Sequence, residues 1–138
     1  MRIAVKALNS DATLNNFEVL DQFNICKGDT AVLNFQLYDA EKGLRYIPAA
    51  GATLTITISR FPQYLPTPAN ARETVDYTIT GSAANPFADD RSIWTFSLTA
   101  LQTATLTSSA VKFVLTEGSV VRNVTVPMMI SASNQDLN

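Results

Sequence analysis

The residue types that most often carry out chemistry in proteins are scarce in this chain. It has no histidine and a single cysteine, Cys26. Histidine is the commonest general base and metal ligand, so its absence removes histidine-based catalysis and the usual pH switch. Serine and threonine are abundant, yet there is no Gly-x-Ser-x-Gly elbow and no spacing that marks a Ser/Lys dyad. The sequence therefore predicts a protein that is not an enzyme and uses no cofactor.

The lone cysteine also limits the covalent chemistry. Cys26 cannot form an intramolecular disulfide, and without histidine or cysteine partners it cannot build a zinc site. A single cysteine is most often a small buried hydrophobic residue, and we favour this interpretation. An intermolecular disulfide is the alternative.

Carboxylates could support glycoside hydrolysis or bind Ca²⁺. Most acids here fall in predicted turns or at strand ends, where such residues usually cap turns and face solvent. Asp89 and Asp90 could contribute to a calcium site, but no wider acidic set accompanies them, so we favour a solvated loop. We therefore predict no metal site. The other acids considered are Asp29, Asp39, Glu41, Asp76 and Glu117.

The charge pattern excludes some classes of partner. Charged residues make up 16% of the 138 residues and the net charge is −2. The basic residues are scattered, so no cationic face is predicted for nucleic acid. No run approaches the roughly 18 apolar residues that span a bilayer, and the start of the chain has no secretory signal pattern. We expect one domain, made in a cytoplasm, that binds neither nucleic acid nor membrane.

The low charge has two interpretations. The charged fraction lies below the roughly one quarter that is typical of soluble domains. Neutral surface is easily desolvated, so it suits contact with other protein subunits. Alternatively, Ser, Thr, Asn and Gln supply an ordinary polar surface. Composition alone leaves both open.

Alternation of apolar and polar residues predicts β-strands through most of the chain. The clearest run is 53–60, in which Leu54, Ile56 and Ile58 face a core and threonines face outward. The segments 110–116 and 120–126 flank a short Gly loop, which predicts a hairpin. Further strands are predicted at 17–26, 30–39, 73–80 and 91–98.

One segment has a different pattern. Thr99 followed by Gln102 matches a capping box, which predicts one or two helical turns within 99–106. Leu101 and Leu106 of this segment could both reach a core. The helical turns would connect two strands.

Seven or so short strands with one helical connection predict an all-β, Ig-like antiparallel β-sandwich. The whole chain, 1–138, would form this single domain. Residues 1–16 are predicted to be an N-terminal arm, and 131–138 a polar C-terminal tail. Both segments could become ordered on binding a partner.

A loop at 61–72 is the best candidate for partner contact. It contains three prolines, and large apolar groups on a proline-stiffened loop lose little entropy on docking. Alternatively, these groups fold back over an open end of the domain, and we favour that interpretation. The residues are Phe61, Tyr64 and Leu65.

Two stretches resemble a known family. Gly28-Asp29-Thr30 opens an alternating strand to Asp39, and after a Gly turn the segment 50–58 begins Ala-Gly-Ala-Thr and alternates again. The later segment 94–106, followed by a hairpin, continues the pattern. Together they resemble the N-terminal domains of phage baseplate upper proteins and related Ig-like virion domains. The resemblance covers about half of the chain.

This resemblance implies a structural subunit of a tailed-phage virion, in the baseplate, the tail or a capsid decoration layer. Its partners would be other virion proteins, in a homo-oligomer or a lattice. A carbohydrate-binding or adhesion module of the Ig-like type is the alternative, because exposed aromatic faces can stack on sugars. The aromatic residues considered for that role are Tyr64, Tyr77 and Trp94.

Overall fold

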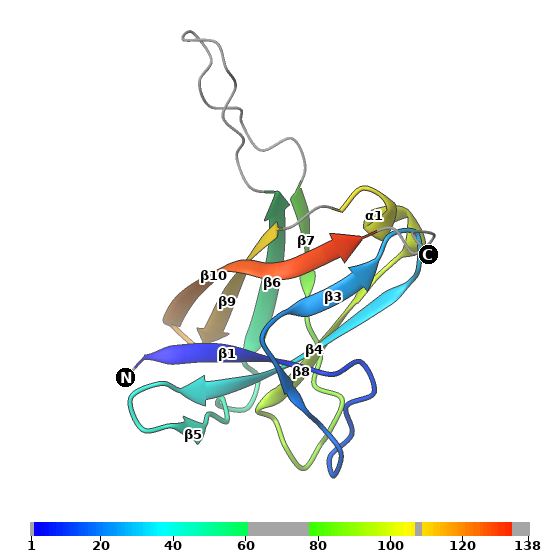
Figure 1. Cartoon of the computed structure of the whole chain (residues 1–138). Coiled ribbons are helices and arrows are strands. Elements are labelled where there is room, and N and C mark those ends of the chain that lie inside the picture. Colours follow the sequence, from blue (N-terminus) through cyan, green and yellow to red (C-terminus); the bar gives the residue numbers. More distant parts are fainter. Residues whose placement is uncertain (1, 61–77, 107–108, 134–138) are drawn as a thin grey trace, which may run out of the picture.

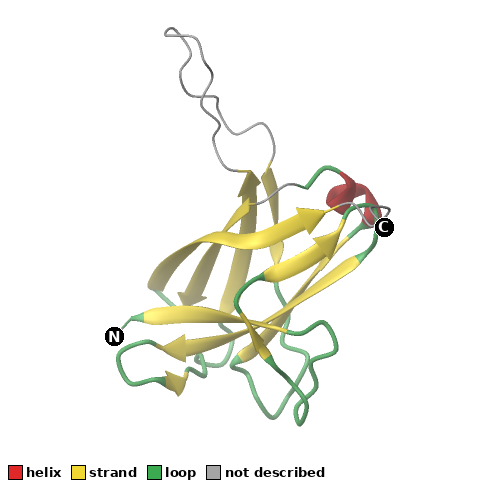
Figure 2. Cartoon of the chain, in the orientation of Figure 1, coloured by secondary structure: helices red, strands yellow, loops and turns green. Residues whose placement is uncertain are grey.

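The computed structural model describes residues 2–60, 78–106 and 109–133, without the side chains of residues 60 and 127–129. In this part of the chain the secondary structure is almost entirely β (Figure 2). The prediction of an all-β protein is confirmed. The elements are β1 (Ile3–Leu8), β2 (Val19–Leu20), β3 (Phe23–Cys26), β4 (Ala31–Asp39), β5 (Leu44–Arg45), β6 (Thr53–Arg60), β7 (Thr78–Ser82), β8 (Ile93–Leu98), α1 (Ala100–Ala104), β9 (Ser109–Glu117) and β10 (Val120–Ser133) (Figure 1).

The first sheet is built around β4. β1 pairs antiparallel with one side of β4, and β2 extends the sheet beyond β1. β8 and β5 pair antiparallel with the other side of β4, next to different parts of it. The alternate residues Leu33, Phe35 and Leu37 of β4 are buried in the core, as the period of two predicts.

The second sheet has the order β3-β10-β9-β6-β7. β6 matches the predicted strand 53–60, and the predicted hairpin is present as β9 and β10. The tight turn between them uses Gly118 at φ +61°, a conformation that favours glycine. β3 pairs parallel with β10, so the prediction of a purely antiparallel sandwich is wrong at this edge.

The strand β10 is longer than the sequence predicted. It continues past Pro127 to Ser133, with a shift of register between Val126 and Ile130. Proline within a sheet is tolerated at such irregularities because it cannot donate a ladder hydrogen bond. Residues 131–133 therefore pair with β3 instead of beginning a loose tail.

The two sheets are joined at both sides. On one side the predicted strand 17–26 is split, because β2 belongs to the first sheet and β3 to the second, with Asp21 and Gln22 between them. On the other side Ala84 exchanges two main-chain hydrogen bonds with Thr95 of β8, at 3.0 and 2.7 Å. This bridge connects the end of β7 to β8.

The core lies between the two sheets and draws on both. The rings of Phe35 on β4 and Phe113 on β9 meet there with centroids 5.0 Å apart. Leu54, Ile56 and Ile58 of β6 are each at most 1% exposed, as predicted. Burial of such side chains is the main driving force for the fold.

The predicted helical connection is present as α1. Thr99 and Gln102 form the expected capping box, with hydrogen bonds of 2.9 and 3.2 Å. The buried Thr103 hydroxyl accepts a hydrogen bond from the N–H of Gly28, which docks α1 on the turn between β3 and β4. Leu106 is buried as predicted, but Leu101 is 81% exposed, so that part of the prediction is wrong.

The predicted N-terminal arm, residues 1–16, is wrong for residues 3–8. These residues form β1, which pairs with β4 along its whole length. Ile3, Ala7 and Leu8 are buried, so this strand is part of the folded unit. The apolar run Ile3-Ala4-Val5 is typical of a strand, but it is too short to predict a strand of this length.

Candidate interaction surface

The loop residues predicted to contact a partner, Phe61, Tyr64 and Leu65, lie outside the described residues. Their role stays a prediction. Trp94, on which the sugar-binding alternative also depended, is 4% exposed and packs in the core. Its ring faces are therefore not available to stack on a sugar. Tyr77 lies outside the described residues as well.

Glu117, at the end of β9, ties the β9–β10 hairpin to the segment between β5 and β6. Its carboxylate accepts hydrogen bonds from the Tyr46 hydroxyl at 2.6 and 2.8 Å and from the Ala49 N–H at 2.9 Å. Nε of Arg122 on β10 lies 3.6 Å from the same carboxylate. The Glu117 side chain is only 11% exposed, so these contacts replace the water it loses.

The same contacts determine the ionisation of this pair. Burial raises the pKa of the Glu117 carboxyl, but the hydrogen bonds from Tyr46 and Ala49 and the charge of Arg122 outweigh it and hold that pKa below its ordinary value. The pKa of Tyr46 is raised, first by burial and then by the hydrogen bond and charge of Glu117. Both pKa values move away from neutrality, which suits a structural contact better than acid–base catalysis.

We call the segments 44–49 and 117–121 the hairpin end. Four large apolar side chains are exposed on it: Leu44 at 64%, Ile47 at 44%, Val120 at 46% and Val121 at 56%. These side chains lie on two segments that the hydrogen bonds of Glu117 join, and a partner protein could cover them. Because Glu117 fixes both segments, little backbone entropy would be lost when a partner docks.

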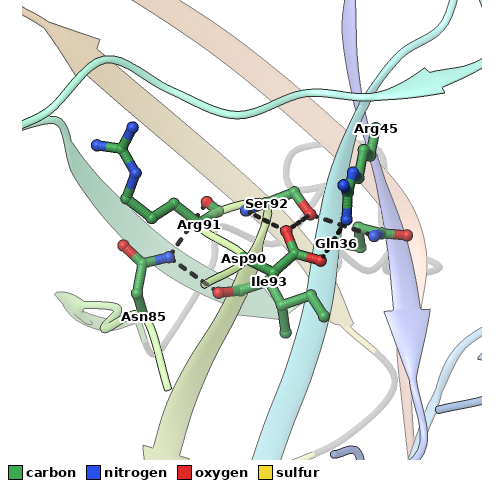
Figure 3. A network of polar contacts seen from close by, with 7 residues as sticks. All are labelled: Gln36, Arg45, Asn85, Asp90, Arg91, Ser92 and Ile93. Atoms are coloured by element: carbon green, nitrogen blue, oxygen red, sulfur yellow. Dashed lines mark hydrogen bonds and ion pairs between the residues drawn. The ribbon is translucent and has the colours of Figure 1, made fainter. Parts of the chain in front are cut away.

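A buried polar network lies on the outer face of the first sheet (Figure 3). Asp90 is 4% exposed and accepts hydrogen bonds from the N–H and hydroxyl of Ser92, at 3.0 and 2.5 Å. Arg45 forms an ion pair with it at 2.9 Å. Gln36 of β4 donates to the Ser92 hydroxyl at 3.2 Å. The prediction that Asp89 and Asp90 lie in a solvated loop is therefore wrong for Asp90.

A second side chain fixes the same loop. The amide of Asn85 donates to the main-chain carbonyls of Arg91 and Ile93, at 3.2 and 2.9 Å (Figure 3). Sequence reasoning missed Asn85 and Asp90 as structural residues. The spacing of Asp90 and Ser92 matches an Asx turn, a signal that could have identified a structured loop.

An open groove of about 380 Å³ lies between β3 and the first part of β4. Cys26, at its edge, is an exposed free thiol, so the prediction of a buried cysteine is wrong. We call this feature the β3–β4 groove. Its lining residues are Leu8, Asn9, Ser10, Leu20, Phe23, Asn24, Ile25, Cys26, Asp29, Thr30, Ala31, Val32 and Leu33.

In the part of the chain that the structure describes, no three His, Cys, Asp or Glu residues gather closely enough to hold a metal ion. Within the same ranges no helix combines the length and apolar character that a membrane span needs.

Comparison with protein-family models, with curated proteins and with solved structures finds no match to this chain.

Proposed function

We propose that this chain is a structural subunit of a tailed-phage virion, in the baseplate, the tail or a capsid decoration layer. In this proposal it is not an enzyme and needs no cofactor. It acts by burying surface against other virion proteins, as part of a homo-oligomer or a lattice, and the fold is a variant of the Ig-like sandwich. The resemblance in sequence and the mostly antiparallel sheets support this proposal.

The observation that carries the proposal is the hairpin end. Leu44, Ile47, Val120 and Val121 are exposed there, on segments that the Glu117 carboxylate holds together. When another subunit covers apolar side chains on a fixed surface, their removal from water stabilises the complex. The exposed charge of Arg45 beside them would lie at the polar rim of such an interface.

The decisive experiment measures the composition of purified particles. Mass spectrometry should find this chain at a fixed copy number that fits the symmetry of the particle. Absence of the chain from purified particles would remove the proposal.

A pair of variants tests the surface itself. Val121→Asp should lower incorporation into particles, because a carboxylate cannot be desolvated cheaply in an apolar interface. Leu101→Asp is the matched control, because Leu101 is exposed on α1 at the opposite end of the molecule (Figure 1). Equal incorporation of both variants would rule out the hairpin end as the assembly surface.

A further inference from the structure

The two sides of β4 differ in how far they are paired. On the β8 side the pairing runs from Gln36 back to Ala31. On the β1 side it stops at Asn34, which pairs with Leu8. The first residues of β4 therefore have a strand partner on one side, and the β3–β4 groove on the other.

Asn34 explains why β1 leaves the sheet at this point. Its buried side-chain amide donates to the carbonyls of Asn9 and Ser10, both at 3.1 Å. Asn9 in turn exchanges hydrogen bonds with Glu18, at 3.1 and 2.9 Å. These contacts hold the chain after Leu8 on the outer face, away from the position opposite Val32.

The direction of the main-chain groups follows from the alternation along a strand. The N–H of Leu37 donates to Ser92 on the β8 side, and that of Ala40 donates to Arg2 on the β1 side. Odd-numbered residues of β4 thus face β8, and even-numbered ones face β1. The N–H and C=O of Val32 consequently point into the groove.

The same reasoning applies to β3, an edge strand. The N–H of Lys27 donates to Ser133 of β10 at 2.9 Å, so Ile25 and Phe23 also direct their main-chain groups towards β10. The N–H and C=O of Asn24 therefore face away from β10, on the groove side. The groove thus lies between two strand edges that present main-chain donors and acceptors.

The lining defines the chemistry of an occupant. Phe23, Ile25 and Leu33 form an apolar floor continuous with the core. Val32, 45% exposed, also lines the groove, and Asp29 is the only charged residue in the lining. Such a surface favours an uncharged segment with small apolar side chains at alternate positions.

We propose that the β3–β4 groove accepts an extended, uncharged segment of a partner protein as an added strand. The segment would run antiparallel to β4, extend the pairing that β1 leaves at Asn34, and bond the main chains of Val32 and Asn24. Alternate side chains would cover the apolar floor. This inference rests on the proposed function in assembly and names the mode of one contact.

The test uses the whole chain and a capped peptide with the sequence of residues 53–58, an uncharged alternating strand of this protein. In the free protein the amides of Asn24 and Val32 should exchange quickly with deuterium, and those of Ile25 and Leu33 slowly. The peptide should bind with a dissociation constant of about 1 mM or lower, and it should slow the exchange at Asn24 and Val32.

The control peptide is N-methylated at the amides that would face β4, and its affinity should fall by roughly tenfold for one lost hydrogen bond. Val32→Lys should weaken binding of the unmodified peptide by roughly fivefold, because a lysine blocks strand addition at an edge. Leu101→Lys, at an exposed leucine on α1 that does not line the groove, should leave binding unchanged.

Slow exchange at Asn24 and Val32 in the free protein would overturn the proposal. So would absence of binding at about 1 mM, or equal binding of the methylated peptide. Because these measurements use the isolated chain, they are independent of the particle composition. The groove can therefore fail while the proposed function stands, and the reverse also holds.

Discussion

The two sides at which the sheets meet close in different ways. Between β7 and β8 the chain returns through Ala84, which bonds Thr95 and covers the outer edge of β8. Between β3 and β4 a short turn connects the sheets, and among the residues that the structure describes the first part of β4 has no strand paired on its β1 side. We call them the bridged side and the groove side.

The difference is set by buried polar side chains. On the bridged side the buried Asp90, with the exposed Asn85 beside it, holds the loop 83–92 against the sheet. On the groove side Asn34 holds the residues after β1 on the outer face of the first sheet, away from the edge of β4 at Val32. In both places one side chain decides where a short segment of main chain lies, because a buried polar group must be hydrogen-bonded.

The largest expected effect is on the bridged side. Asp90→Ala removes the acceptor for the buried N–H of Ser92, and should lower the free energy of unfolding by about 2–3 kcal/mol. Arg45 adds little to this cost because its side chain is 58% exposed. Urea denaturation measures the change. Asp89→Ala is the matched control, and a similar loss in both variants would contradict a special role for Asp90.

A smaller loss is expected where β7 and β8 approach each other. A Cβ at Gly81 would lie 2.7 Å from Cε1 of Phe96, so Gly81→Ala forces the ring or the strand to move. We expect a loss of about 1–2 kcal/mol in thermal or urea denaturation. Ser82→Ala, at the exposed end of the same strand, should stay within about 0.5 kcal/mol. A neutral Gly81→Ala variant would show that the bridged side packs less tightly than described.

The Glu117 contact should give the next effect, since it joins the β9–β10 hairpin to the segment between β5 and β6. The pKa of Glu117 is lowered in the folded state. Its contribution to stability is therefore present above the ordinary pKa and is lost as the pH falls below about 4. Glu117→Gln should lower the free energy of unfolding by about 1 kcal/mol at pH 7. It should also reduce the further loss of stability as the pH falls below about 4.

The test measures the urea denaturation midpoint of the wild type and of Glu117→Gln at a series of pH values. Glu18→Gln, which changes an exposed acid, should keep the slope of the wild type. The raised pKa of Tyr46 acts at the other end of the scale, where its contribution is present below about pH 10 and is lost above it. If the urea midpoint of Glu117→Gln fell with pH as steeply as that of the wild type, the Glu117 contact would not form in solution.

The smallest effect is expected on the groove side. Val32 is 45% exposed, so Val32→Lys should change the free energy of unfolding by no more than about 0.5 kcal/mol. Denaturation midpoints of Val32→Lys and Val121→Lys should agree with that of the wild type. A large loss in Val32→Lys alone would mean that the groove side is packed as firmly as the bridged side.

Local pattern was sufficient to predict many of the elements. The alternation in 53–60 predicts β6 with its correct bounds, and the capping box at Thr99 predicts α1. These predictions succeed because side-chain period and capping geometry depend only on residues close in the chain. The outcome for Cys26 differed, because exposure depends on which strand lies next to β3.

The candidate sites depended on distant partners. Glu117 meets Tyr46 across 71 positions of the sequence, and Asp90 meets Arg45 across 45. No local pattern in the sequence indicates such pairs, so the sequence predicts that their acids are ordinary turn residues. The groove likewise depends on Asn34 bonding a segment 24 and 25 positions away.

The sequence by itself determined the all-β class, the hairpin and the capped helical turn, because each is encoded in neighbouring residues. Only the tertiary structure decided which strand edges are covered, that β3 and β10 run parallel, and which acids are buried. Those features arise when segments far apart in the chain compete for the same main-chain donors and acceptors. The competition is settled by packing, which no stretch of sequence shows on its own.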